Sequence, residues 1–123
     1  IPLKHKVPTC GFLFTERHRD QEPRKRYAYC SDTAYREQIV EQIAGVDVLY
    51  HEATYTEKDV DKCKKHTHST AKQAANIARL AGVGKLVIGH FSAREDDHNV
   101  FLEEAKEVFE NTVLAIERTT IDI

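Results

Sequence analysis

The apolar residues of this chain fall into short runs that are typical of β-strands. The predicted strands lie at residues 7–16, 26–30, 46–50, 86–88 and 113–116, with Ile121 extending or following the last. The runs at 46–50 and 86–88 have the composition of strands buried in a sheet. A polar stretch rich in Arg and Lys separates the first two runs.

Other segments carry apolar residues at helical spacing. Three helices are predicted: about ten residues ending at Gly45, a segment capped by Ser69 or Thr70 that ends at Gly82, and residues 101–109. The second has a face of small Ala side chains, which allows close approach to a sheet. The polar connections 51–65 and 91–98 are predicted as loops. Strands and helices that alternate in this way favour an α/β fold with a mainly parallel sheet and covering helices.

Composition limits the size and class of the protein. A chain of 123 residues with 41% hydrophobic residues forms about one domain. Its net charge of −2 and pI of 6.4 exclude a basic surface over the whole chain, so contact with nucleic acid would need a local patch or a metal. No apolar run approaches the roughly 20 residues of a membrane span, and residues 1–8 lack a signal-peptide layout, which predicts a cytoplasmic location.

Two residue types bear on processing and redox state. The three cysteines, Cys10, Cys30 and Cys63, are widely spaced, which favours reduced thiols over a disulfide framework or a zinc finger. Methionine is absent, so Ile1 is not a translation start. We therefore expect this chain to be processed or to belong to a longer protein.

Residues that bind metals or transfer protons follow three of the predicted strands. Asp32 follows the second strand, His51 and Glu52 the third, and His90 the fourth. The carboxyl ends of parallel strands meet at one edge of a sheet, where ligands bind. Taken singly, Asp32 is equally consistent with a helix N-cap, and His90 with a hydrogen-bonded core histidine. Their shared position favours a site.

Further polar residues lie in the loops. His66 and His68 flank Thr67, but a zinc site usually needs three or four protein ligands, so this pair alone does not predict one, and we assign His66 to a solvated loop. The basic residues form two clusters: Arg17, Arg19, Arg24, Lys25 and Arg26, and Lys58, Lys62, Lys64 and Lys65. Each cluster is consistent with a phosphate contact or with a solvated loop.

Four motifs occur in order along the chain. They read Tyr29-Cys30-Ser31-Asp32-Thr33, His51-Glu52-Ala53-Thr54, His68-Ser69-Thr70-Ala71 with Gln73-Ala74-Ala75, and Gly89-His90-Phe91-Ser92-Ala93-Arg94. Together they resemble the signatures of the ribonuclease Z family, the tRNA 3′-processing endonucleases of the metallo-β-lactamase superfamily. Residues 2–12 also resemble the segment that follows that family's tRNA-binding arm, so the resemblance spans nearly the whole chain.

The resemblance implies an αββα sandwich of which residues 1–123 form a single partial domain, the carboxyl-terminal half. In that family the arm, a His-x-His-x-Asp-His motif and a further histidine ligand lie upstream, and this sequence contains none of them. The resemblance further implies that Asp32 bridges two zinc ions and that His90 binds one of them. Glu52 and His68 resemble the family's pair near the leaving oxygen, and Arg94 resembles an arginine that contacts substrate phosphate.

The implied function is that of a zinc-dependent endoribonuclease that removes the 3′ trailer of precursor tRNA. The resemblance also implies a homodimer, and we expect the isolated chain to be inactive without the upstream half. Two alternatives remain open at the level of sequence. One is another metallo-β-lactamase-fold hydrolase that acts on a small phosphodiester, and the other is a non-catalytic α/β module for binding or dimerisation.

Overall fold

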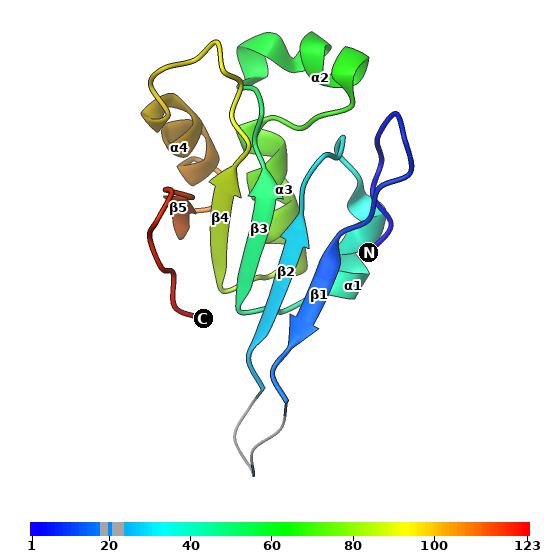
Figure 1. Cartoon of the computed structure of the whole chain (residues 1–123). Helices are drawn as coiled ribbons and strands as arrows, with labels where there is room; N and C mark the ends of the chain where they lie inside the picture. Colours follow the sequence, from blue (N-terminus) through cyan, green and yellow to red (C-terminus); the bar gives the residue numbers. More distant parts are fainter. Residues whose placement is uncertain (18–19, 21–23) are drawn as a thin grey trace.

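The structure, a computed structural model, describes residues 1–17, 20 and 24–123 (Figure 1). The elements are β1 (Phe12–Thr15), β2 (Arg26–Cys30), η1 (Glu37–Ile39), α1 (Val40–Ile43), β3 (Val48–Glu52), η2 (Glu57–Asp59), α2 (Val60–His66), α3 (Ala71–Ala81), β4 (Lys85–Gly89), α4 (Asn99–Lys106) and β5 (Thr112–Leu114). Within these described ranges no helix is both long and apolar enough to span a bilayer.

The strands form one sheet in the order β1-β2-β3-β4-β5. The first pair is antiparallel, and each later pair is parallel. Parallel neighbours need crossover connections, and right-handed crossovers that always step in one direction place their helices on one face. Figure 1 shows α1, α3 and α4 on that face. The predicted α/β fold with a mainly parallel sheet is confirmed.

The core lies between this face and the helices. Alternate strand residues point into it, among them Ala28 of β2, Leu49 of β3 and both Leu86 and Ile88 of β4. The Ala face of α3 is buried against them, and its short side chains allow close packing of helix on sheet. Helix α3 begins at a Thr70 capping box, as one of the two predicted caps requires.

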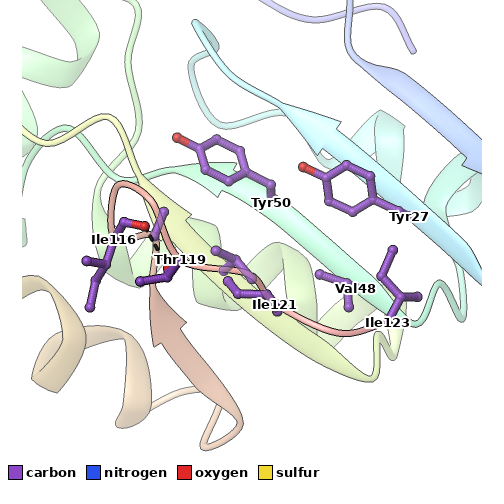
Figure 2. Close-up of a pocket in the computed structure, with 9 residues that line it drawn as sticks. Tyr27, Val48, Tyr50, Ile116, Thr119, Ile121 and Ile123 are labelled. Atoms are coloured by element: carbon purple, nitrogen blue, oxygen red, sulfur yellow. Dashed lines mark hydrogen bonds between the residues drawn. The ribbon is translucent and has the colours of Figure 1, made fainter.

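The opposite face of the sheet is rich in aromatic side chains. Tyr29 and Tyr50 stack at a centroid distance of 4.7 Å, and Phe14 stacks on Tyr27. Residues 115–123 cross this face and enclose, with the sheet, a pocket of about 300 Å³ (Figure 2). The side chain of Phe14 is nevertheless 55% exposed. Sheets with two apolar faces are typical of proteins in which a further layer covers the second face.

The first predicted strand and helix are both shorter than the sequence indicates. Strand β1 starts only at Phe12, because residues 1–11 close a loop in which the Gly11 amide donates to the Ile1 carbonyl. The first helix is a single turn, α1, preceded by the 3₁₀ turn η1. Ile121 lies outside the strands.

The prediction of a loop at 51–65 is wrong over most of its length. Strand β3 continues to Glu52, and helix α2 runs from Val60 to His66. Cys63 is the one buried residue of α2, so the segment lacks the apolar periodicity by which a helix is recognised from sequence. Burial raises the pKa of the Cys63 thiol to about 12, as expected of a reduced, unreactive cysteine.

We predict that Thr70→Ala destabilises the fold by about 1 kcal/mol, the usual cost of removing an N-cap side chain. The Thr70 hydroxyl accepts from the Gln73 amide and donates to Glu57, and alanine does neither. Urea unfolding measures the change. Thr70→Ser keeps the hydroxyl and serves as the control, and an alanine variant as stable as the serine variant would contradict the prediction.

Candidate functional site

Four side chains from separate parts of the chain converge at the carboxyl edge of the sheet. Asp32 lies beyond β2, Glu52 ends β3, His90 follows β4, and His68 lies in the turn between α2 and α3. One ligand atom from each residue lies within 4.8 Å of the others. The parallel register that aligns β2, β3 and β4 produces this convergence (Figure 1).

Two of these residues have an uncommon backbone conformation. Asp32 has φ 58° and His90 has φ 60°, both in the left-handed region. Asp and His adopt this region more often than most residues do. Residues in this conformation persist only where the surrounding structure holds them, and they are concentrated at functional sites. The sharp turn after each strand therefore marks the same edge that the side chains do.

The carboxylate of Glu52 is fully buried and accepts four hydrogen bonds. Oε1 accepts from the Thr33 amide at 2.6 Å and from His68 Nδ1 at 2.8 Å. Oε2 accepts from the Thr54 hydroxyl at 2.6 Å and from the Ser69 amide at 3.0 Å. Burial raises the pKa of Glu52, but the hydrogen bonds outweigh it and hold the pKa below its ordinary value. Glu52 is therefore an ionised group with no free lone pair direction for another ligand.

His68 is held by that carboxylate. Its pKa is raised mainly by the hydrogen bond to Glu52, against a smaller lowering by burial. Because Nδ1 donates to Glu52, Nε2 is left for other partners. The ring lies 5.3 Å from that of His90, measured between centroids. An oriented imidazole beside a buried carboxylate is suited to deliver a proton.

Asp32 and His90 provide the donor atoms that face solvent. Asp32 Oδ1 lies 3.4 Å from His90 Nε2, and their side chains are 50% and 43% exposed. The Thr54 hydroxyl, which donates to Glu52, accepts from His90 Nδ1 at 3.0 Å. This places the His90 proton on Nδ1 and leaves the Nε2 lone pair available, as a metal ligand requires.

These donors fit part of a zinc site. A carboxylate oxygen and an imidazole nitrogen are both common zinc ligands. Asp32 and His90 present such atoms together, whereas Glu52 is already saturated with hydrogen bonds. Two ligands are fewer than the three or four that hold zinc tightly, so a stable site needs donors beyond this pair.

A polar groove adjoins the site through Thr54. It has a volume of about 290 Å³, and Arg94, Lys58 and Lys62 line it. The ammonium of Lys58 lies 3.8 Å from Glu95, so charge on this side of the groove is partly balanced. Arg94 thus lies beside the four-residue cluster rather than within it.

Other candidate residues lie elsewhere. His51 is fully buried, and its Nδ1 bonds to the Glu52 carbonyl, while its Nε2 has no hydrogen-bond partner in the described part of the chain. Burial lowers the pKa of His51, so this ring is a neutral core group. His66 ends α2, outside the cluster. Arg19, of the first basic cluster, lies outside the described residues.

The sequence did not predict the backbone and side-chain groups that support the site. Thr33 and Ser69 bond to Glu52 through backbone amides, which no sequence pattern reports. Thr54 lies inside a predicted motif, yet its role as a bridge between Glu52 and His90 depends on side-chain geometry. His5, which contacts Thr67, lies far from the site in sequence.

Comparison with known proteins shows the superfamily of the chain. The model of the Beta-lactamase superfamily domain matches residues 1–91. The chain belongs to the beta-lactamase superfamily. Among solved structures, this superfamily chain is similar to human tRNase Z, short form, at 29% identity and TM-score 0.73, covering 99% of this chain and 40% of that one. It also shares its fold with the metallo-beta-lactamase fold protein YhfI from Bacillus subtilis, at 22% identity and TM-score 0.80, over 93% and 44% of the two chains.

Curated relatives in the superfamily carry the name ribonuclease Z. That of Azobacteroides pseudotrichonymphae genomovar. CFP2 is 46% identical, and that of Bacteroides fragilis (strain YCH46) is 40% identical. Each match covers the whole of this chain but only 52% and 55% of the relative, so the chain spans about half the length of the curated relatives it matches. The predicted resemblance to the ribonuclease Z family is confirmed.

We predict that Glu52→Gln destabilises this superfamily chain by about 1–3 kcal/mol, because the new amide turns a donor toward buried donors. The same change lowers the pKa of His68, which NMR titration of the ring measures. A raised folded pKa means that protonated His68 stabilises the fold fully below its unfolded pKa of about 6.5. That contribution is lost as pH rises through the folded pKa of His68. In the variant the folded pKa of His68 is lower, so the contribution is lost at a lower pH.

Glu110→Gln is the matched control, since Glu110 is exposed and away from the cluster. It leaves both the unfolding free energy and the pKa of His68 unchanged. A Glu52→Gln variant in which His68 titrates as in the parent would show that this carboxylate does not set the charge of the ring.

Proposed function

We propose that the complete protein containing this chain is a zinc-dependent endoribonuclease of the ribonuclease Z type, which removes the 3′ trailer of precursor tRNA. The observation that carries the proposal is the pairing of His68 with Glu52 beside the free donors of Asp32 and His90, all within 4.8 Å. The names of the curated relatives support the choice of RNA as substrate. The protein acts in the cytoplasm as a homodimer.

Asp32 and His90 hold the metal on the side of this chain. Bound zinc supplies a hydroxide at neutral pH and neutralises charge on the phosphoryl oxygens. Asp32 provides a carboxylate oxygen for this purpose, and the Thr54 hydroxyl fixes the His90 ring with Nε2 free. The donor chemistry matches zinc, and the remaining ligands come from the upstream part of the protein.

His68 delivers the proton that the departing 3′ oxygen takes up. As the bond between phosphorus and the 3′ oxygen breaks, its electron pair moves to that oxygen, which would leave as a costly alkoxide. Protonation from His68 Nε2 avoids this, and Glu52 stabilises the charged ring beforehand. Arg94, at the adjoining groove, binds a neighbouring phosphate with its planar guanidinium.

The chain acts as the carboxyl-terminal portion of a larger fold. Two features support this reading. The aromatic face of the sheet needs a second layer to cover it. The pair of metal donors, Asp32 and His90, needs further ligands to hold zinc tightly. The second half of an αββα sandwich would provide both.

We predict that Asp32→Ala and His68→Ala each reduce cleavage of precursor tRNA by the complete protein by about 100-fold or more, in line with removal of a metal ligand or a general acid. Gel analysis of the 3′ products measures the rate, and elemental analysis of the parent finds about two zinc ions per chain, as a dinuclear hydrolase requires. Asp122→Ala, at an exposed terminal carboxylate, is the control and retains activity.

Two outcomes would replace the proposal. A complete protein that turns over a small phosphodiester faster than precursor tRNA is a different hydrolase of this superfamily. One that contains no stoichiometric metal and cleaves neither substrate is a binding or dimerisation module.

We also predict that the 123-residue chain by itself does not cleave precursor tRNA and loses zinc on simple dialysis, since two protein ligands hold the ion weakly. Adding the upstream half as a separate polypeptide restores cleavage. Specific cleavage by the chain alone, abolished by Asp32→Ala, would show that it already contains a complete centre.

A further inference from the structure

Basic side chains are exposed on helix α2 and on two loops beside it. Lys62, Lys64 and Lys65 of α2 are all exposed to solvent. Lys6, before β1, and Arg94, after β4, are exposed as well. The net charge of the whole chain is −2, so this concentration of positive charge is local rather than general.

The lysines of α2 lie on two flanks of the helix. Lys62 and Lys65, three positions apart, share one flank, because an α-helix has 3.6 residues per turn. Lys64 and Asp61, also three positions apart, share the other flank. Lys62 lines the polar groove together with Arg94, so its flank faces the groove that adjoins the site. Lys65 therefore lies on the flank toward the groove, and Lys64 does not.

Positive charges from separate segments act on His66, the last residue of α2. Its pKa is lowered, first by partial loss of hydration and then by the charges of Lys6, Lys65, His68 and Arg94. We name Lys6, Lys65 and Arg94 the cationic rim. Like charges repel, so an anion that binds among the members of the rim is stabilised by all of them.

The members of the cationic rim are not neutralised by neighbouring carboxylates. Lys62, next to the rim on α2, lies 3.2 Å from Asp59 and is paired with it. In the part of the chain that the structure describes, Lys6, Lys65 and Arg94 form no ion pair with a carboxylate. Unpaired charges of one sign on an exposed surface suit a polyanion such as a nucleic-acid backbone.

The cationic rim lies on the same side of the site as His68. His66 is two residues before His68 in the chain. The charge of Lys6 also opposes the hydrogen bond to Glu52 that raises the pKa of His68. In the proposed reaction His68 protonates the departing 3′ oxygen, which belongs to the nucleotide that stays on the tRNA. The strand that runs 5′ from the cut therefore leaves the site on this side.

We propose that the cationic rim binds backbone phosphates of the RNA strand on the 5′ side of the cut. This inference rests on the function proposed above, and it assigns to the rim the 3′ end of the tRNA body rather than the trailer. Contacts from Lys and Arg to phosphates add affinity but carry no sequence information. The rim thus positions the strand without selecting its sequence.

The basic residues of α2 also have a structural role that the test must separate from binding. Cations in the last turn of a helix stabilise the helix through its dipole. Lys64 and Lys65 both lie in the last turn of α2, so both have this effect. Lys64→Ala is therefore the matched control for Lys65→Ala, since it removes the same charge from the same turn on the other flank.

The test measures the binding of mature tRNA, which ends in the 3′ hydroxyl that cleavage leaves, to the complete protein. We expect Kd to rise about 4- to 10-fold in Lys65→Ala and in Lys6→Ala, and to stay within about twofold of the parent in Lys64→Ala. The slope of log K against log salt becomes shallower by about 0.7 to 0.9 for each lysine removed from the rim. Lys65→Arg keeps the charge and retains the parent affinity.

A trailer oligonucleotide with a 5′ phosphate distinguishes the two sides of the cut. It contains only the strand on the 3′ side, so its Kd changes less than about twofold in every variant. For precursor tRNA, kcat stays within about twofold of the parent, because His68 and the zinc donors are unchanged. Urea unfolding and zinc content are measured for each variant and match the parent.

Three results would overturn the role of the cationic rim: equal loss of affinity in Lys64→Ala and Lys65→Ala, an unchanged salt slope, or equal loss of affinity for the trailer and for tRNA. If Lys65→Ala does not fold, Lys6→Ala decides, because it lies outside the helix. A parent protein that binds tRNA but does not cleave precursor tRNA overturns the proposed function. A parent that cleaves it, with lysine variants that bind normally, overturns the rim alone.

Discussion

The buried carboxylate of Glu52 is the interaction on which the site depends. Its four donors come from three segments: the turn after β2, the turn after β3, and the residues before α3. A buried charge is costly unless every lone pair is satisfied, so these segments are stable only in the arrangement that supplies all four bonds. The same arrangement orients His68. The geometry of the site is therefore a consequence of satisfying one buried charge.

The topology of the sheet explains why the buried Glu52 carboxylate lies at the carboxyl edge of the strands. The parallel strands β2, β3 and β4 end at one edge, and their crossovers keep the helices on one face. On the other face Tyr29 and Tyr50 stack on each other, and Tyr50 lines the pocket shown in Figure 2. A sheet with helices on one face, polar groups at one edge and an apolar second face fits one half of an αββα sandwich.

Sequence patterns predicted the parts whose signal is local. Strand β2 and helix α3 have clear boundaries because a strand composition and a capping box each lie within a few residues. Helix α2 was missed because it buries Cys63 alone, so it carries little apolar periodicity. The strand-end motifs identified Asp32 and His90, but no local pattern relates His5 to Thr67, since that bond joins residues 62 positions apart.

His68 and His90 are both oriented by a hydrogen bond at Nδ1, but the partner differs between the two rings. In His68 and His90, Nδ1 is engaged by a neighbour, so Nε2 is directed to other partners. For His68 the neighbour is a carboxylate, which raises the pKa and favours a ring that carries a proton. For His90 it is the Thr54 hydroxyl, which orients the ring and leaves a lone pair on Nε2. The different acceptors at Nδ1 thus suit the two rings to the roles proposed for them, proton donor for His68 and metal ligand for His90.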